Sequence, residues 1–348
     1  SNIGTRPTIA AVAAAATLGS LAAYMGLARM RSMLSALKRS DPHISLGRRH
    51  LHGDIMVYDK GHVVFRTAPK VPSRKYLIFV GGLTDGLMAT NYVAPLAKAV
   101  NKREWTFLQP LISSSYTGYG SQSLALDCQE LSELVRKIRK EQADATIVLM
   151  GHSTGCQDAV TYCRRYHQQQ MLGAESRING VILQAPVSDR ESMAMKPEEK
   201  TEKWLKLATS MIAEGKAEDL MPQESYFIPI TAYRYHSLAG KNTDDDLFSS
   251  DFTMDELKGK LGCVDVAALV LYSGEDEYVP EHVNRRALVD RMSAATGTSQ
   301  SLGVLIECAD HAASSPEATE KVVDLVSRFL DGYFCDGNPN LVSHQLDQ

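Results

Sequence analysis

The sequence lacks the features that favour binding to nucleic acid or to a structural metal ion. Its 37 Lys and Arg residues are outnumbered by 41 Asp and Glu residues, for a net charge of -4. No basic excess is therefore available to attract phosphate backbones. The six cysteines include no Cys-x-x-Cys pair and no histidines at zinc-ligand spacing. We expect no nucleic-acid partner, no metal and no cofactor, and free thiols in a reducing compartment, cytosolic or mitochondrial.

Charge is also missing from residues 7–28, which are uncharged throughout and rich in alanine. A membrane-spanning helix needs about 20 apolar residues, but alanine contributes little apolar area. A weakly hydrophobic span, a docking helix and a targeting remnant all fit this pattern. Basic residues follow the segment, so a spanning helix would place the rest of the chain on the cytosolic or matrix side. We expect residues 1–50 to form this possible membrane anchor and a basic linker.

Internal repeats are absent, and what remains is an alternation of apolar runs with segments of helical spacing. Continuous apolar runs begin at Lys75, Thr146, Ile178 and Asp265 and are typical of strands covered on both faces. Two alternating runs at 54–59 and 62–67 precede them as a hairpin. Helical spacing occupies residues 87–100, 123–139, 156–169, 282–292 and 317–330. The pattern predicts an α/β protein with a mainly parallel sheet and helices on both faces.

The alternation stops at residues 188–262, which we interpret as a cap inserted between the sixth and seventh strands. The core would then comprise residues 51–187 and 263–332, with a tail at 333–348. Aromatic and basic residues in the cap could line a substrate pocket: Tyr226, Phe227, Tyr233, Arg234 and Tyr235. The acidic residues 244–246 could favour a cationic ligand. The alternative is a packed aromatic cluster with a solvated acidic loop.

The sequence Gly151-His152-Ser153-Thr154-Gly155 carries the strongest chemical signal. It follows an apolar strand and precedes a helix, which is the context of a nucleophile elbow in the α/β-hydrolase fold. The two glycines let neighbouring backbone pass close to a strained turn, which lifts the hydroxyl of Ser153 out of the sheet. The helix amino terminus then points to the position where negative charge develops. A plain glycine-rich turn is the alternative.

A serine nucleophile needs an imidazole base and a carboxylate to orient it, and this fold places them in the order Ser, acid, His. His311 follows a strand-like run that starts at Gly303, and Asp276 follows the strand before it. Glu275 and Glu277 are rival acids in the same turn. His152 is expected to pack beside the serine rather than to act as base, and Cys156 to be a buried small residue.

Oxyanion donors are expected at two backbone N–H groups. One belongs to Thr154, directly after the nucleophile, and the other to Leu83, which follows Gly81-Gly82 at the end of an early strand. A Gly-Gly turn with only a structural role is the alternative for the second position.

Several motifs together resemble one family of α/β hydrolases. They are GGLTDGL, SSSYTGYGSQSL, GHSTGCQD, PITAYRYHSL, DDDLFSSDF and SGEDEYVP. They are similar to the family that contains the fungal siderophore esterase fusarinine C hydrolase, over residues 54–332. The resemblance implies a triad at Ser153, Asp276 and His311 and activity on ester bonds, including those of hydroxamate-containing peptides. The first and last segments of the chain lie outside it.

Two functions are compatible with these patterns. The first is a serine hydrolase that cleaves a small carboxylic ester through an acyl-enzyme. The second is a non-catalytic accessory subunit of a larger membrane-bound assembly, held by the uncharged segment at residues 7–28. The triad favours the first function and the uncharged segment favours the second.

Overall fold

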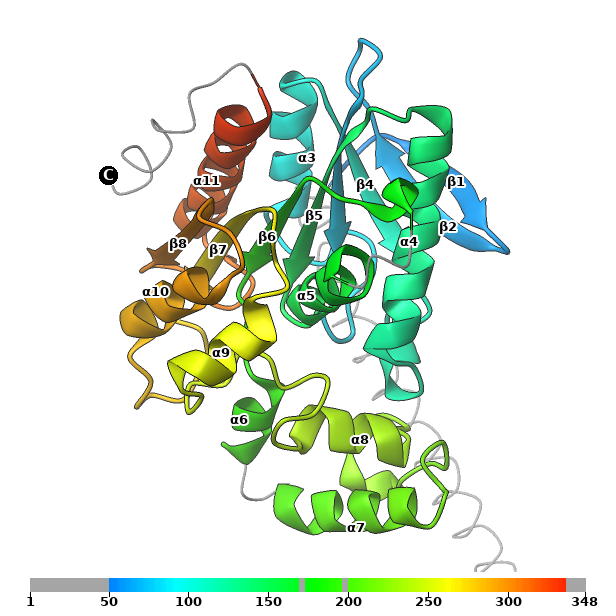
Figure 1. Ribbon diagram of the computed structural model, residues 1–348, viewed down its shortest axis with the longest axis vertical. Helices are drawn as coiled ribbons and strands as arrows, with labels where there is room; N and C mark the ends of the chain where they lie inside the picture. The colour runs from blue at the N-terminus through cyan, green and yellow to red at the C-terminus, as the bar shows by residue number, and fades with distance from the viewer. Residues whose placement is uncertain (1–49, 169–172, 196–199, 336–348) are drawn as a thin grey trace, which may run out of the picture. The chain divides into compact units, whose positions relative to one another are not determined.

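The computed structural model describes residues 50–168, 173–195 and 200–335. One sheet dominates this part of the chain, with strands in the order β1-β2-β4-β3-β5-β6-β7-β8 (Figure 1). The strands are β1 (Asp54–Asp59), β2 (His62–Thr67), β3 (Lys75–Val80), β4 (Trp105–Leu111), β5 (Thr146–His152), β6 (Gly180–Gln184), β7 (Ala267–Ser273) and β8 (Ser301–Ile306). β2 pairs antiparallel with β1 and β4. All other neighbours are parallel, so their carboxyl ends meet at one edge.

Both faces of the sheet are covered, because alternate residues of its central strands enter two different apolar clusters. Ile78 of β3 belongs to the cluster that includes residues of α4, α5 and α10, whereas Leu77 belongs to the cluster that includes residues of α3 and α11. Figure 1 shows these two sets of helices flanking the sheet. The helices are α3 (Val93–Lys102), α4 (Leu124–Glu141), α5 (Gly155–Cys163), α10 (Arg285–Ala295) and α11 (Pro316–Phe334). The continuous apolar runs of the sequence reflect this burial from two sides.

Two helices differ from the ranges that the sequence predicts. The helix expected from residue 87 begins only at Val93, because Thr84 and Met88 adopt positive φ angles of 68° and 62° that a right-handed helix excludes. The helix expected to reach residue 169 ends as α-helix at Cys163 and continues as a π-helical segment, Arg164–Gln168. The turns between β3 and α3 line the cavity described below.

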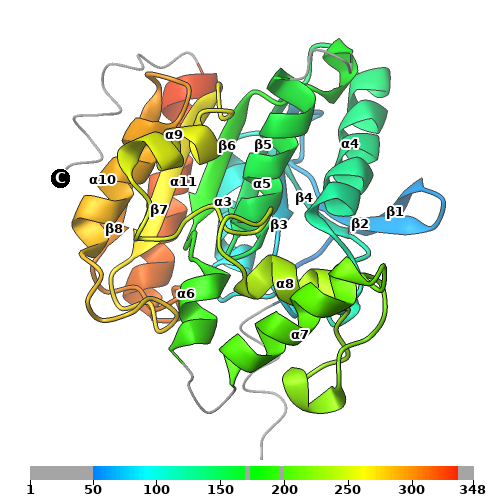
Figure 2. The same ribbon diagram turned by 60° about the horizontal axis from the view of Figure 1, so that its bottom comes forward.

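Between β6 and β7 the chain forms α6 (Asp189–Ala194), α7 (Thr201–Ala213), α8 (Ala232–Ala239) and α9 (Met254–Leu261). α7 and α8 lie beyond one end of the sheet (Figure 2) and share a separate apolar cluster that includes Trp204 and Leu238. α9 instead packs beside α10 and adds Leu257 to the main core. The predicted cap boundaries at residues 188 and 262 stay a prediction.

None of the helices in the described ranges combines the length and the apolar character that a membrane crossing requires. The uncharged segment at residues 7–28 lies outside those ranges, as does most of the predicted tail at 333–348.

Candidate active site

A strained turn places Ser153 at the carboxyl edge of the sheet, between the end of β5 and the start of α5. Its φ angle is +54°, a left-handed conformation that L-residues rarely adopt. A Cβ on Gly151 would lie 2.1 Å from the carbonyl oxygen of Gly155, and one on Gly155 would lie 2.4 Å from that of Val80. Only glycine fits at both positions, so the spacing of the motif follows from steric packing.

His311 lies after β8, and its ring is held by the turn that follows β7. Nδ1 of His311 is 2.8 Å from Oδ2 of Asp276, whose side chain is buried. Oδ1 of Asp276 accepts a hydrogen bond from the backbone N–H of Tyr278 at 3.0 Å. The rival acids have other positions: Glu277 accepts from the backbone N–H of His311 at 3.0 Å, and Glu275 is exposed.

Ser153 and His311 line the same cavity, which has a volume of about 340 Å³. This volume suits a small organic ligand. Three carboxylates and three aromatic side chains also line it, and none of its lining residues within the described ranges is a lysine or arginine: Asp85, Asp189, Glu277, Tyr226, Phe227 and Tyr278. The edge of the Tyr278 ring packs against His311 with the centroids 4.6 Å apart. The lining of the cavity therefore combines aromatic surfaces with several acidic side chains.

The loop after β3 also lines this cavity, and Asp85 shapes the loop. The backbone N–H of Gly82 donates to Oδ2 of Asp85 at 2.8 Å, and the N–H of Asp85 donates to the carbonyl of Gly82 at 3.1 Å. A Cβ on Gly82 would lie 2.5 Å from Cβ of Ser153. Glycine thus lets the loop approach the serine, and Leu83 lines the cavity.

Thr154 occupies the N-cap position of α5 and is buried. Its hydroxyl donates to Oδ2 of Asp189 at 3.4 Å. Among the described residues, no hydrogen-bond acceptor is found for the backbone N–H of Thr154 or of Leu83. Both groups are therefore available to a ligand.

A buried polar network lies beneath the two histidines. Oε1 of Gln184 accepts from the hydroxyl of Tyr92 at 2.7 Å and lies 2.6 Å from Nδ1 of His152. Nε2 of Gln184 donates to the backbone carbonyl of His311 at 3.3 Å. Burial, and then the charge of His311, lower the pKa of His152 to about 3. His152 is therefore neutral at physiological pH. Its ring centroid is 5.0 Å from that of His311, which is close enough for the charge of one ring to disfavour a charge on the other.

The structure divides the cap residues that the sequence suggested for substrate binding. Tyr226 lines the catalytic cavity. Tyr233 and Tyr235 are not among the residues that line it: the hydroxyl of Tyr233 donates to Asp244 at 2.5 Å, and Tyr235 is buried in the cap cluster. Arg234 is buried and donates to Asp245 at 2.9 Å. For these three residues, packing and pairing explain the sequence pattern.

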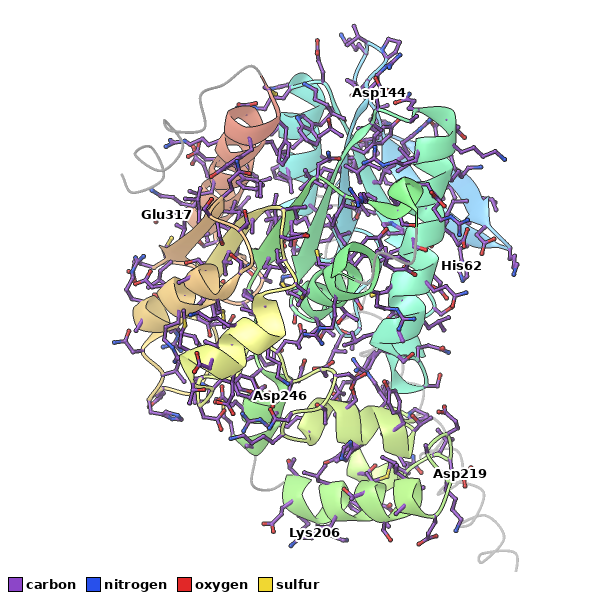
Figure 3. All side chains as sticks on the ribbon, viewed as in Figure 1. His62, Asp144, Lys206, Asp219, Asp246 and Glu317 are labelled. Atoms are coloured by element: carbon purple, nitrogen blue, oxygen red, sulfur yellow. The ribbon has the colours of Figure 1, made fainter. Side chains whose placement is uncertain are left out.

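The acidic residues 244–246 also have partners within the protein. Asp245 pairs with Arg234, and Asp246 accepts from the N–H of Asn242 at 2.8 Å and lies 3.3 Å from Nε of Arg190. The loop that carries Asp246 lies near α9 (Figure 3). These contacts do not leave the segment open for a separate cationic ligand.

Sequence reasoning missed Asp85, Gln184 and Tyr278. Gln184 carries a visible signal, because it is a polar residue at the end of the apolar run of β6 and a buried polar side chain needs partners. Asp85 and Tyr278 lie in turns, where the sequence gives no reason to distinguish them from solvated residues. Within the described ranges, no group of three or more His, Cys, Asp or Glu residues could hold a metal ion.

Comparison with known proteins places the chain in a family. Residues 45–331 match the family model described as "Protein of unknown function (DUF1749)". The chain belongs to the DUF1749 family. Its eight-stranded sheet and its structural relatives also confirm the predicted α/β-hydrolase fold.

Two relatives and one solved structure illustrate what the DUF1749 chain is similar to. An esterase of Emericella nidulans is 30% identical over 72% of this chain and 84% of its own length. The fusarinine C esterase of Aspergillus fumigatus is 31% identical over 74% of this chain and 88% of its own length. The siderophore hydrolase EstB from Aspergillus fumigatus superposes with a TM-score of 0.71 at 29% identity, covering 83% of this chain and 99% of that one. The predicted family resemblance is confirmed.

Proposed function

We propose that this DUF1749 chain is a serine esterase that acts through an acyl-enzyme. One observation carries the proposal: Ser153, held on a strained turn, lines one cavity with His311, whose ring lies 2.8 Å from the buried Asp276. A serine, histidine and aspartate in this order of contact activate a weak hydroxyl nucleophile, and we infer that Nε2 of His311 reaches Oγ of Ser153. The relatives that are named esterases and hydrolases support the same chemistry.

In the proposed reaction, Oγ of Ser153 attacks the ester carbonyl carbon while Nε2 of His311 takes the hydroxyl proton. Asp276 accepts the Nδ1–H of His311, which fixes the tautomer and stabilises the imidazolium. The N–H groups of Leu83 and Thr154 donate to the tetrahedral oxyanion. His311 then gives its proton to the leaving alcohol, and the acyl-enzyme forms.

Deacylation repeats these steps with water. His311 takes a proton from the water, whose oxygen attacks the acyl carbonyl, and the bond to Oγ of Ser153 breaks as the proton returns to the serine. His152 does not compete as base, because it is buried and its Nδ1 is hydrogen-bonded to Gln184. Free carboxylic acid and free enzyme result.

The cavity volume of about 340 Å³ restricts the substrate to small esters or to one end of a larger ester. The names of the two Aspergillus fumigatus relatives support a siderophore-like ester as the candidate. Tyr226 and Phe227 line the cavity from the segment between α7 and α8, and we include both among the substrate-binding residues. Membrane contact through residues 7–28 and membership of a larger assembly stay predictions, because that segment lies outside the described ranges.

A fluorophosphonate probe tests the proposed nucleophile directly. We expect one site of labelling at Ser153, loss of labelling and of ester hydrolysis in Ser153→Ala, and unchanged labelling in Ser192→Ala. Ser192 is the matched control because it lines the same cavity outside the elbow. Folded protein that resists the probe, or labelling that persists in Ser153→Ala, would contradict the proposal.

A further inference from the structure

A small polar chamber is lined by the loop after β3, which carries Leu83. It measures about 30 Å³, space for one or two molecules the size of water. Leu83 and Asp85 line both this chamber and the catalytic cavity, and Thr154 lines the chamber as well. The chamber is therefore next to the two proposed oxyanion donors.

The chamber is acidic. Asp85, Asp127 and Asp158 line it, and Arg234 is its one strong cation within the described ranges. That guanidinium is already engaged by Asp245 at 2.9 Å and by the hydroxyl of Ser237 at 3.1 Å. Arg234 thus leaves an excess of carboxylates facing the chamber.

One of those carboxylates has an oxygen without a partner. Asp158 is 3% exposed, yet its Oδ1 has no hydrogen-bond partner among the described residues. An uncompensated buried carboxylate is costly and either takes up a proton or binds a cation. Burial, and then the charge of Asp127, raise the pKa of Asp158 well above its ordinary value. A cationic N–H donor beside Oδ1 would relieve this cost.

We propose that the chamber binds the ammonium group of an amine-bearing ester whose carbonyl lies at Ser153, so that the chain selects cationic esters. This inference rests on the proposed esterase function and names its substrate class. An ammonium group is close to water in size and offers N–H donors in several directions. Because Leu83 and Asp85 line both spaces, a substrate with its carbonyl at Ser153 lies next to the chamber that would take its amine. The catalytic cavity is lined by three carboxylates and, among the residues that the structure describes, by no lysine or arginine, so it admits the same charge.

Matched ester pairs test the proposal. The pairs are p-nitrophenyl 3-aminopropanoate with butanoate and p-nitrophenyl 6-aminohexanoate with heptanoate, which differ mainly in charge. We expect kcat/KM to favour the amine in at least one pair by on the order of tenfold, as for one charge-assisted hydrogen bond. Asp158→Asn should reduce that ratio to near one. Asp219→Asn should leave it unchanged, because Asp219 is exposed at the outer end of the cap (Figure 3).

A binding measurement separates this inference from the proposed function. Propylammonium should bind saturably to Ser153→Ala in calorimetry, and the binding should be lost when Asp158→Asn is added. Asp127→Asn is the second variant if Asp158→Asn does not fold. Hydrolysis of the neutral esters with ratios near one would overturn the inference alone, as would propylammonium-soaked crystals that hold only water in the chamber. Binding of propylammonium without hydrolysis of any ester would overturn the proposed function and support the subsite.

Discussion

Asp276 is the residue at which the proposed mechanism is most sensitive to a single atom. In Asp276→Asn an amide replaces the carboxylate that lies 2.8 Å from Nδ1 of His311. We expect kcat for ester hydrolysis to fall by about 10³ to 10⁴, because the ring loses the tautomer that leaves Nε2 free to accept a proton. Steady-state kinetics measures the loss, and urea denaturation checks that the variant is folded.

Glu275→Gln is the control for this change, because Glu275 is exposed in the same turn. It should keep wild-type kcat. A large loss in Glu275→Gln, or a small loss in Asp276→Asn, would mean that another acid orients His311.

Residue-level prediction is possible where chemistry and local sequence coincide. Ser153 is proposed from the glycines that its turn requires, and His311 from its place after β8. Gln184 is different, because its contact with the backbone of His311 joins residues 127 positions apart. No local pattern contains such a contact, so the network beneath the histidines becomes visible only in the folded chain.

At the scale of the element, the N-terminus of α4 offers a test of local stability. The side chain of Ser123 accepts from the N–H of Leu126 and caps the helix. Ser123→Ala should lower the free energy of unfolding by about 1 kcal/mol, measured by urea denaturation. Ser121→Ala is the control, because the hydroxyl of Ser121 makes only exposed hydrogen bonds, with the carbonyl of Gly118 and the side chain of Gln122, each at 3.3 Å. Equal losses in the two variants would contradict the capping argument.

Elements with uniform patterns are predictable, and interrupted ones are not. The hairpin of β1 and β2 has the bounds that its alternating residues indicate. β4 is not identified, because Gln109 and Pro110 break its apolar run. Pro110 is tolerated because the pairing of β4 with β3 ends at Leu108, so that β4 has only β2 as a neighbour there. That register is decided by residues more than 30 positions away.

At the scale of the whole molecule, Arg234 connects the α8 helix to acids of the core. It is buried and lines the chamber with Asp127 of α4 and Asp158 of α5. Arg234→Gln should lower the free energy of unfolding by about 3–5 kcal/mol, because it leaves the buried Asp245 without its ion-pair partner. Thermal or urea denaturation measures this loss.

Arg74→Gln is the matched control, because Arg74 and its partner Asp144 are both exposed. The free energy of unfolding of Arg74→Gln should fall by at most about 1 kcal/mol. If the two variants are equally stable, the buried guanidinium contributes no more than a surface charge.

The same acids make the stability of the folded chain depend on pH. Burial raises the pKa of Asp127 from 3.8 to about 7. The folded state therefore holds a proton that the unfolded state loses between these values, and stability falls as pH rises from about 4 to 7. Asp127→Asn should reduce that fall by a few kcal/mol at most, since one pKa unit corresponds to about 1.4 kcal/mol. Urea denaturation at pH 5 and pH 8 measures it.

In Asp127→Asn the fall in stability with rising pH should become smaller without disappearing. The reason is that burial also raises the pKa values of Asp158, Asp189 and Asp245. Asp219→Asn should leave the pH dependence as in the wild type. An unchanged slope in Asp127→Asn would show that this carboxylate is ionised throughout the range.

The buried guanidinium of Arg234 on α8 limits which caps can replace the cap of this hydrolase in a chimera. A chimera that received its lid from a distant hydrolase would lose Arg234 while α4 and α5 kept their acids. Such a chimera would keep two buried acids without the guanidinium that shares their chamber, even if the new cap folded well. Cap and core must therefore be exchanged as a matched set, with Asp127 and Asp158 moved together with Arg234.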